Sequence, residues 1–247
     1  MERPVSQALF LRHWRLSALT LLATGVITLG ACHAPASHDL PPEVPSGYRS
    51  DLRSQHATKH MAAAANPLAA EAGRQMLREG GSAIDAAIAM QAVLTLVEPQ
   101  SSGIGGGALI VLWDGQQVRA YDGRETAPAG ATGEMFLHAD GKPMTFAQAQ
   151  IGGRSVGTPG VLRALKMAHD KHGRLPWARL FEPAIELARN GFAISPRLHT
   201  LIASDPHLPG SPQMAAYFLN TDGSPKAVGT RLQNPALAKV LARIASE

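Results

Sequence analysis

The chain lacks several features that would define common classes of protein. It has one cysteine, which excludes an intramolecular disulfide and a cysteine-rich metal site. Its formal net charge is only +4, and its basic residues are scattered among acids without interleaved aromatics, so nucleic acid is not an expected partner. The ten histidines show no HExxH spacing, and His169 and His172 are expected to cap a helix end or contact solvent. The sequence predicts no metal and no cofactor.

The first part of the chain has the pattern of an export signal. A basic start precedes an uncharged stretch over residues 16–31, which is shorter than the about 20 apolar residues of a membrane span. The stretch ends in Leu29-Gly30-Ala31-Cys32, which resembles a bacterial lipobox. We therefore expect residues 1–31 to be a lipoprotein signal peptide and Cys32 to carry lipid. The alternatives are a plain secretory signal and an uncleaved anchor helix.

These features predict where the protein resides. Because residue 33 is histidine rather than aspartate, the pattern resembles default sorting to the outer membrane. We expect an exported, periplasmic protein held to that membrane by lipid. Residues 32–56 are rich in proline, serine and charge, which is typical of a flexible tether. The folded domain is then expected over residues 57–247.

The first half of this domain has clear boundary signals. A small apolar run over residues 60–65 could form a buried strand. Asn66 and Pro67 are typical of a helix start, and Ser82 with Asp85 resembles a capping box for a second, almost wholly apolar helix that must be buried. Two extended runs, 108–113 and 116–122, flank Asp114-Gly115 and predict a hairpin inside a larger sheet.

The second half is predominantly helical. A helix capped by Thr158 is predicted to reach Gly173, and two short helices follow at residues 180–181 and 183–188. A last amphipathic helix begins at Pro235. It is expected to turn inward the side chains of Leu237, Val240, Leu241 and Ile244. This helix meets the end of the chain without a stop signal, as expected of an incomplete domain.

Two segments have patterns that are common in ligand sites. The run Gly105-Gly106-Gly107 precedes a strand, whereas phosphate loops follow one and open a helix, so close backbone packing is the favoured role. Arg124 lies at the end of a buried strand, where its guanidinium could hold a carboxylate by two parallel bonds. The alternative is that Arg124 pairs structurally with Asp122 or Glu125.

Five segments in one order resemble the γ-glutamyltransferase (glutathione hydrolase) family. They are Asn66-Pro67-Leu68-Ala69 with Gly80-Gly81-Ser82-Ala83-Ile84-Asp85-Ala86-Ala87, Pro99-Gln100 with Gly103-Ile104-Gly105-Gly106-Gly107, Arg124-Glu125-Thr126-Ala127-Pro128, Gly157-Thr158-Pro159-Gly160, and Pro183-Ala184-Ile185-Glu186-Leu187-Ala188-Arg189-Asn190-Gly191-Phe192. The resemblance implies an α+β fold, the αββα four-layer sandwich of N-terminal-nucleophile hydrolases. Residues 57–247 would supply only part of the large subunit.

The resemblance also implies a mechanism. The precursor would cut itself into a large and a small subunit and expose a threonine whose own α-amine serves as general base. This threonine would attack glutathione or another γ-glutamyl compound, and water or an amino acid or dipeptide acceptor would then take the glutamyl group. Arg124 would grip the donor's α-carboxylate. The family's Thr-Thr-His stretch is absent from these residues, so no catalytic residue is expected in this chain.

Two other interpretations remain open. One is a non-catalytic, lipid-anchored periplasmic binding protein that uses Arg124 for a carboxylate ligand. The other is a related self-processing amidase, such as a cephalosporin acylase, because the matching segments are mostly scaffold.

Overall fold

A computed structural model describes residues 54–247 of the chain. Cys32, the predicted signal peptide and most of the predicted tether lie outside the described residues. The α-helices are α2 (Pro67–Arg78), α3 (Ala83–Val97), α4 (Phe146–Gln150), α5 (Val161–His172), α6 (Glu182–Asn190), α7 (Pro196–Ser204), α8 (Pro212–Phe218) and α9 (Pro235–Ser246). Short 3-10 helices are η1 (Gly153–Ser155), η2 (Trp177–Phe181) and η3 (Leu208–Gly210), and the strands are β1 (Ala108–Trp113), β2 (Val118–Gly123), β3 (Phe192–Ala193) and β4 (Arg231–Leu232).

The starts of α2 and α3 form as the sequence predicts. The Asn66 side chain accepts a hydrogen bond from the Leu68 amide at 3.0 Å, and Pro67 occupies the first turn. Ser82 and Asp85 form a reciprocal capping box, in which the Ser82 amide donates to the Asp85 carboxylate at 2.7 Å. These caps satisfy amide groups that the first turn of a helix leaves without a partner.

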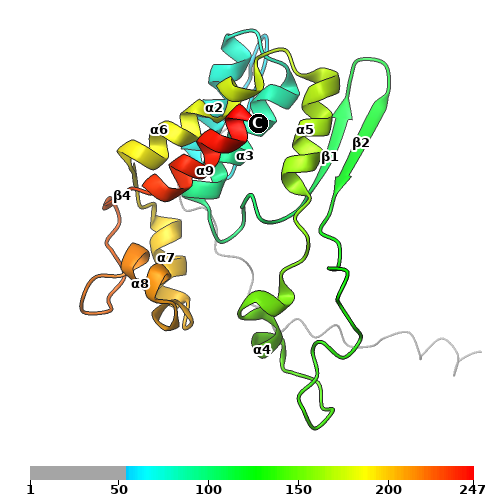
Figure 1. Cartoon of the computed structure of the whole chain (residues 1–247). Coiled ribbons are helices and arrows are strands. Elements are labelled where there is room, and N and C mark those ends of the chain that lie inside the picture. The colour runs from blue at the N-terminus through cyan, green and yellow to red at the C-terminus, as the bar shows by residue number, and fades with distance from the viewer. Residues whose placement is uncertain (1–53) are drawn as a thin grey trace, which may run out of the picture. The chain divides into compact units, whose positions relative to one another are not determined.

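The core gathers around α3. Ile88 of α3, Phe181 of η2 and Leu241 of α9 are each at most 1% exposed. Figure 1 shows α2, α3, α6 and α9 packed together, with α9 running beside α6. Burying one such large side chain contributes about 1.5–3 kcal/mol, so this cluster holds the helices in place. In the described part of the chain, no helix is long and apolar enough to cross a membrane.

The predicted hairpin is confirmed. β1 and β2 pair antiparallel from Ala108 opposite Gly123 to Trp113 opposite Val118, and α5 packs beside them (Figure 1). The larger sheet that we expected is not formed within residues 54–247, where β1 and β2 pair only with each other. Side chains on one face of β1 are partly buried, whereas Leu109, Val111 and Trp113 on the other face are exposed to solvent.

Three local predictions were wrong. Residues 60–65 form no strand, because no neighbouring strand in the described part pairs with them, and they lie mostly at the surface. The helix predicted from Thr158 begins at Val161, because the backbone N–H and C=O of Thr158 bond to Thr126 instead. Val240 of α9 is 46% exposed, while Ala238 takes the buried position that we assigned to it.

Candidate functional site

Arg124 stands directly after the last residue of β2. The Asp122 carboxylate accepts a hydrogen bond from the Arg124 backbone amide at 2.9 Å, which fixes the chain as it leaves the strand. The guanidinium is 76% exposed, and its Nη1 lies 3.5 Å from Oε2 of Glu125. Such a distance leaves a loose ion pair, so most of the guanidinium donors face solvent. The carboxylate-binding role of Arg124 stays a prediction.

The glycine loop packs against this residue pair. A Cβ atom placed on Gly107 would lie 2.5 Å from the Glu125 carboxylate and 2.7 Å from the carbonyl oxygen of Gly123. Any side chain there would push Glu125 away, so only glycine allows the observed approach. The Gly106 carbonyl accepts the amides of Gly160 and Val161 at 3.1 Å each, which ties the loop to the start of α5. This is the packing role that the sequence favoured.

Two clefts meet at Arg124 and Glu125. The first, the glycine-loop cleft, has a volume of about 440 Å³ and is lined by residues 101–103 and 105–107 together with Gln91 and Pro99. The second, the Arg154 cleft, has about 350 Å³ and is lined by residues 124–128, 131, 135, 136 and 154–157. Both volumes fall in the range of roughly 300–1,000 Å³ that small-molecule sites occupy. Arg124 can therefore reach a ligand in either cleft.

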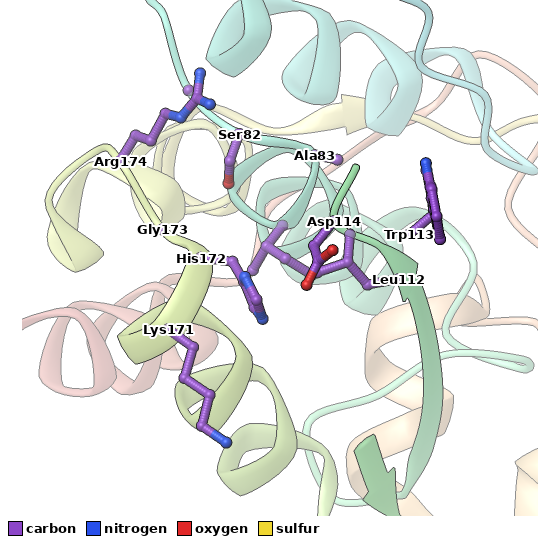
Figure 2. A pocket seen from close by; sticks show the side chains of 11 residues that line it. Ser82, Ala83, Leu112, Trp113, Asp114, Lys171, His172, Gly173 and Arg174 are labelled. Carbon is purple, nitrogen blue, oxygen red and sulfur yellow. The ribbon is translucent and has the colours of Figure 1, made fainter. Parts of the chain in front are cut away.

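A third and larger cleft, of about 480 Å³, lies away from Arg124 between the start of α3 and the hairpin tip. Two of its polar side chains already have partners: the ring of His172 is 2.8 Å from the Tyr121 hydroxyl, and the Asp114 carboxylate accepts the Gln117 amide and the Arg119 side chain. These bonds, led by the Gln117 amide, lower the pKa of Asp114 to about 2. Figure 2 shows Lys171 and Arg174 pointing in opposite directions. Because its cations do not converge, this cleft is a weaker candidate than those at Arg124.

The histidines that the sequence singled out also have structural partners. His169 Nε2 lies 2.9 Å from the Leu175 carbonyl oxygen and 3.6 Å from the buried Asp85 carboxylate. The other oxygen of Asp85 accepts the amides of Arg174 and Leu175 at 2.9 and 3.2 Å. These residues thus organise the turn after α5. No group of metal-ligating side chains gathers in residues 54–247.

A buried ion pair supports the entrance of the glycine loop, and sequence reasoning missed it. Glu98, at the end of α3, is 1% exposed and accepts Arg197 Nε at 3.0 Å, Gln100 Nε2 at 2.6 Å and Asn66 Nδ2 at 3.2 Å. Its partners come from α7, the loop itself and the start of α2. A single acid between an apolar helix and Pro99 was the signal that could have revealed it.

The family follows from the sequence comparison. The model of the family described as Gamma-glutamyltranspeptidase matches residues 69–247, which include both clefts at Arg124. The chain belongs to the gamma-glutamyltranspeptidase family. The glutathione hydrolase proenzyme of Bacillus subtilis (strain 168) is 37% identical over 239 residues, which make up 96% of this chain and 40% of that protein. The chain therefore spans less than half the length of that relative.

Solved structures support the same family. The crystal structure of Helicobacter pylori gamma-glutamyltranspeptidase matches with a TM-score of 0.74 at 32% identity, covering 78% of this chain and 56% of that chain. A cephalosporin acylase from Bacillus halodurans matches with a TM-score of 0.59 at 29% identity, covering 73% and 34%. The expected α+β class and the family are thereby confirmed, and the transpeptidase is the better structural match of the two.

Proposed function

We propose that this chain supplies the donor-binding part of an enzyme that transfers or hydrolyses γ-glutamyl groups. One observation carries the proposal: an exposed guanidinium, Arg124, stands at a strand end where two clefts meet, inside the region that matches the gamma-glutamyltranspeptidase family. Glutathione and related γ-glutamyl compounds are the proposed donors. The name glutathione hydrolase, which the Bacillus subtilis relative bears, agrees with this choice.

In the proposed mechanism the nucleophile lies outside this chain. A threonine freed by self-cleavage attacks the γ-carbonyl while its own α-amine accepts the hydroxyl proton, and oxyanion donors stabilise the tetrahedral intermediate. The amine of the leaving group departs and a γ-glutamyl ester remains. Water or an amino acid or dipeptide acceptor then receives the glutamyl group. Arg124 holds the donor's α-carboxylate throughout and so fixes the γ-carbonyl before the threonine.

The bare face of the hairpin supports a second subunit as partner. Leu109, Val111 and Trp113 of β1 are 71%, 77% and 61% exposed, and Val118 of β2 is 66% exposed. A continuous apolar strand face in water is typical of a surface that another element covers. We propose that the threonine-bearing small subunit covers this face and thereby brings its nucleophile to Arg124.

The Arg124 assignment is tested in an assembly of this chain with a separately expressed C-terminal part of the precursor, here called the assembled enzyme. Arg124→Ala removes a charged contact worth about 2–5 kcal/mol, so the KM for a γ-glutamyl anilide should rise steeply, and Arg124→Lys should restore part of it. Arg119→Ala, which removes an arginine of the same strand, is the control. The chain alone should show no turnover. An unchanged KM in Arg124→Ala would contradict the assignment.

The same assay separates the alternatives. A non-catalytic binding protein would bind glutamate-like ligands through Arg124 but show no turnover in any assembly. An acylase-like amidase would turn over acyl amides that carry no α-carboxylate, and Arg124→Ala would then have little effect. The higher TM-score to the transpeptidase favours the γ-glutamyl activity over the acylase activity.

We further propose that the protein is exported and anchored to the outer membrane by lipid on Cys32, on the strength of its lipobox-like run. The wild-type protein should then fractionate with membranes, and Cys32→Ala should release it into the soluble fraction. A wild-type protein that is already soluble in the periplasm would refute the anchor.

A further inference from the structure

The Arg154 cleft has a second cation besides Arg124. Arg154 of η1 lines this cleft together with Arg124. Its Nη1 donates a hydrogen bond to the Met135 carbonyl oxygen at 2.6 Å, which holds the side chain across the cleft wall. Within residues 54–247 no carboxylate forms an ion pair with Arg154, whereas Arg124 has Glu125 nearby. A guanidinium with five donors keeps most of them available after one such bond.

The backbone fixes the two arginines at opposite ends of the cleft. Thr126 and Thr158 form an antiparallel bridge, with amide-to-carbonyl distances of 2.8 and 3.4 Å, which joins the two walls. The two segments run in opposite directions, so residues that precede Thr158, such as Arg154, lie on the same side of the bridge as residues that follow Thr126, such as Pro128. Arg124, which precedes Thr126, therefore lies at the other end.

The wall between the two arginines carries several apolar side chains. Met135, Phe136 and Val156 line it. Phe136 and Val156 are partly exposed, because no element of residues 54–247 covers them. The cleft therefore offers a cation at each end and apolar side chains among the residues between them, with Glu125 as its one acidic side chain. A ligand complementary to this pattern carries a carboxylate at each end and a less polar middle.

We propose that Arg154 binds the second carboxylate of a γ-glutamyl peptide, the one at the end remote from the glutamyl group. This inference rests on the proposed function, because it takes Arg124 as the site of the α-carboxylate. Arg154 would then act as a specificity-determining residue. It would favour donors that end in a free carboxylate, such as glutathione, over γ-glutamyl amides whose leaving group is uncharged.

The test compares two donors in the assembled enzyme: glutathione, which has the second carboxylate, and a γ-glutamyl anilide, which lacks it. In Arg154→Ala the KM for glutathione should rise about three- to tenfold, as expected for a charged contact at a partly exposed site. The KM for the anilide should not change. Arg154→Lys should restore part of the effect and Arg154→Glu should enlarge it. Lys142→Ala is the matched control. It removes a cation from the part of the chain between Phe136 and Arg154, and Lys142 lines neither cleft.

A titration of the chain itself, followed by NMR with the same two compounds, provides a second measurement that needs no turnover. Resonances near Arg154 should shift with glutathione and not with the anilide. Equal effects of Arg154→Ala on both donors, or none on either, would overturn the proposal. If Arg124→Ala weakens both donors while Arg154→Ala weakens neither, the proposed function stands and this inference falls. If Arg154→Ala alone has an effect, the Arg124 assignment falls instead.

Discussion

The helical body and the β1–β2 hairpin bury their apolar residues to very different extents. In the body, Phe181 and Leu241 are almost inaccessible to solvent, although they lie 60 positions apart in the sequence. In the hairpin, Val111 and Trp113 are more than half exposed. The chain thus buries its large apolar side chains in the body and leaves them exposed to solvent on one face of the hairpin. Stability is therefore expected to reside in the body and assembly in the hairpin.

Charged residues follow the same division. Glu98 and Arg197 are buried in the body and bond to each other, whereas the side chains of Arg124, directly after β2, and of Arg154 in η1 are exposed. A buried ion pair requires both partners, because either charge alone would remain desolvated. An exposed arginine carries no such penalty and is free to bind a ligand. Mutation of Glu98 or Arg197 should therefore lower stability, whereas mutation of Arg124 or Arg154 should weaken ligand binding and leave stability nearly unchanged.

The largest effect on stability is expected at Glu98. Glu98→Ala removes a buried carboxylate that accepts hydrogen bonds from Arg197, Gln100 and Asn66, which should lower the free energy of unfolding by about 3–5 kcal/mol. Glu186→Ala, which removes an exposed acid of α6, is the control and should change it by less than about 0.5 kcal/mol. Urea unfolding of the chain, followed by circular dichroism, measures both. Equal midpoints for the two variants would show that Glu98 does not stabilise the body.

Local patterns determined most of what the sequence predicted correctly. The caps at Asn66 and Ser82 depend on neighbours within three residues, and the Asp114-Gly115 turn specifies the hairpin by itself. The failures depended on distant partners. Thr158 leaves its predicted helix because Thr126 takes its backbone groups, and Glu98 meets Arg197 from 99 positions away. Neither contact leaves a periodic signal in the sequence.

The candidate site divides in the same way. Arg124 was predicted because it ends a strand within a motif of the family, so its place could be inferred without tertiary contacts. Arg154 was not, since only the bridge between Thr126 and Thr158 brings its segment to the same cleft. The tight contact between Gly107 and Glu125 likewise needed the folded structure, although the glycine run indicated close packing.

The smallest effect on stability, and the sharpest test of the contrast, is expected at Val111. Val111→Lys places a charge on a side chain that is already 77% exposed, so the free energy of unfolding of the chain should change by less than about 0.5 kcal/mol. If the small subunit covers the hairpin face, the same lysine would be buried without a partner, and association should weaken severely. Met167→Lys, on an exposed position of α5, serves as the control for added charge. Binding of the separately expressed C-terminal part, measured by calorimetry, should be lost only in Val111→Lys. Undiminished binding would mean that the partner docks elsewhere, while a large loss of stability would mean that the hairpin belongs to the core of this chain.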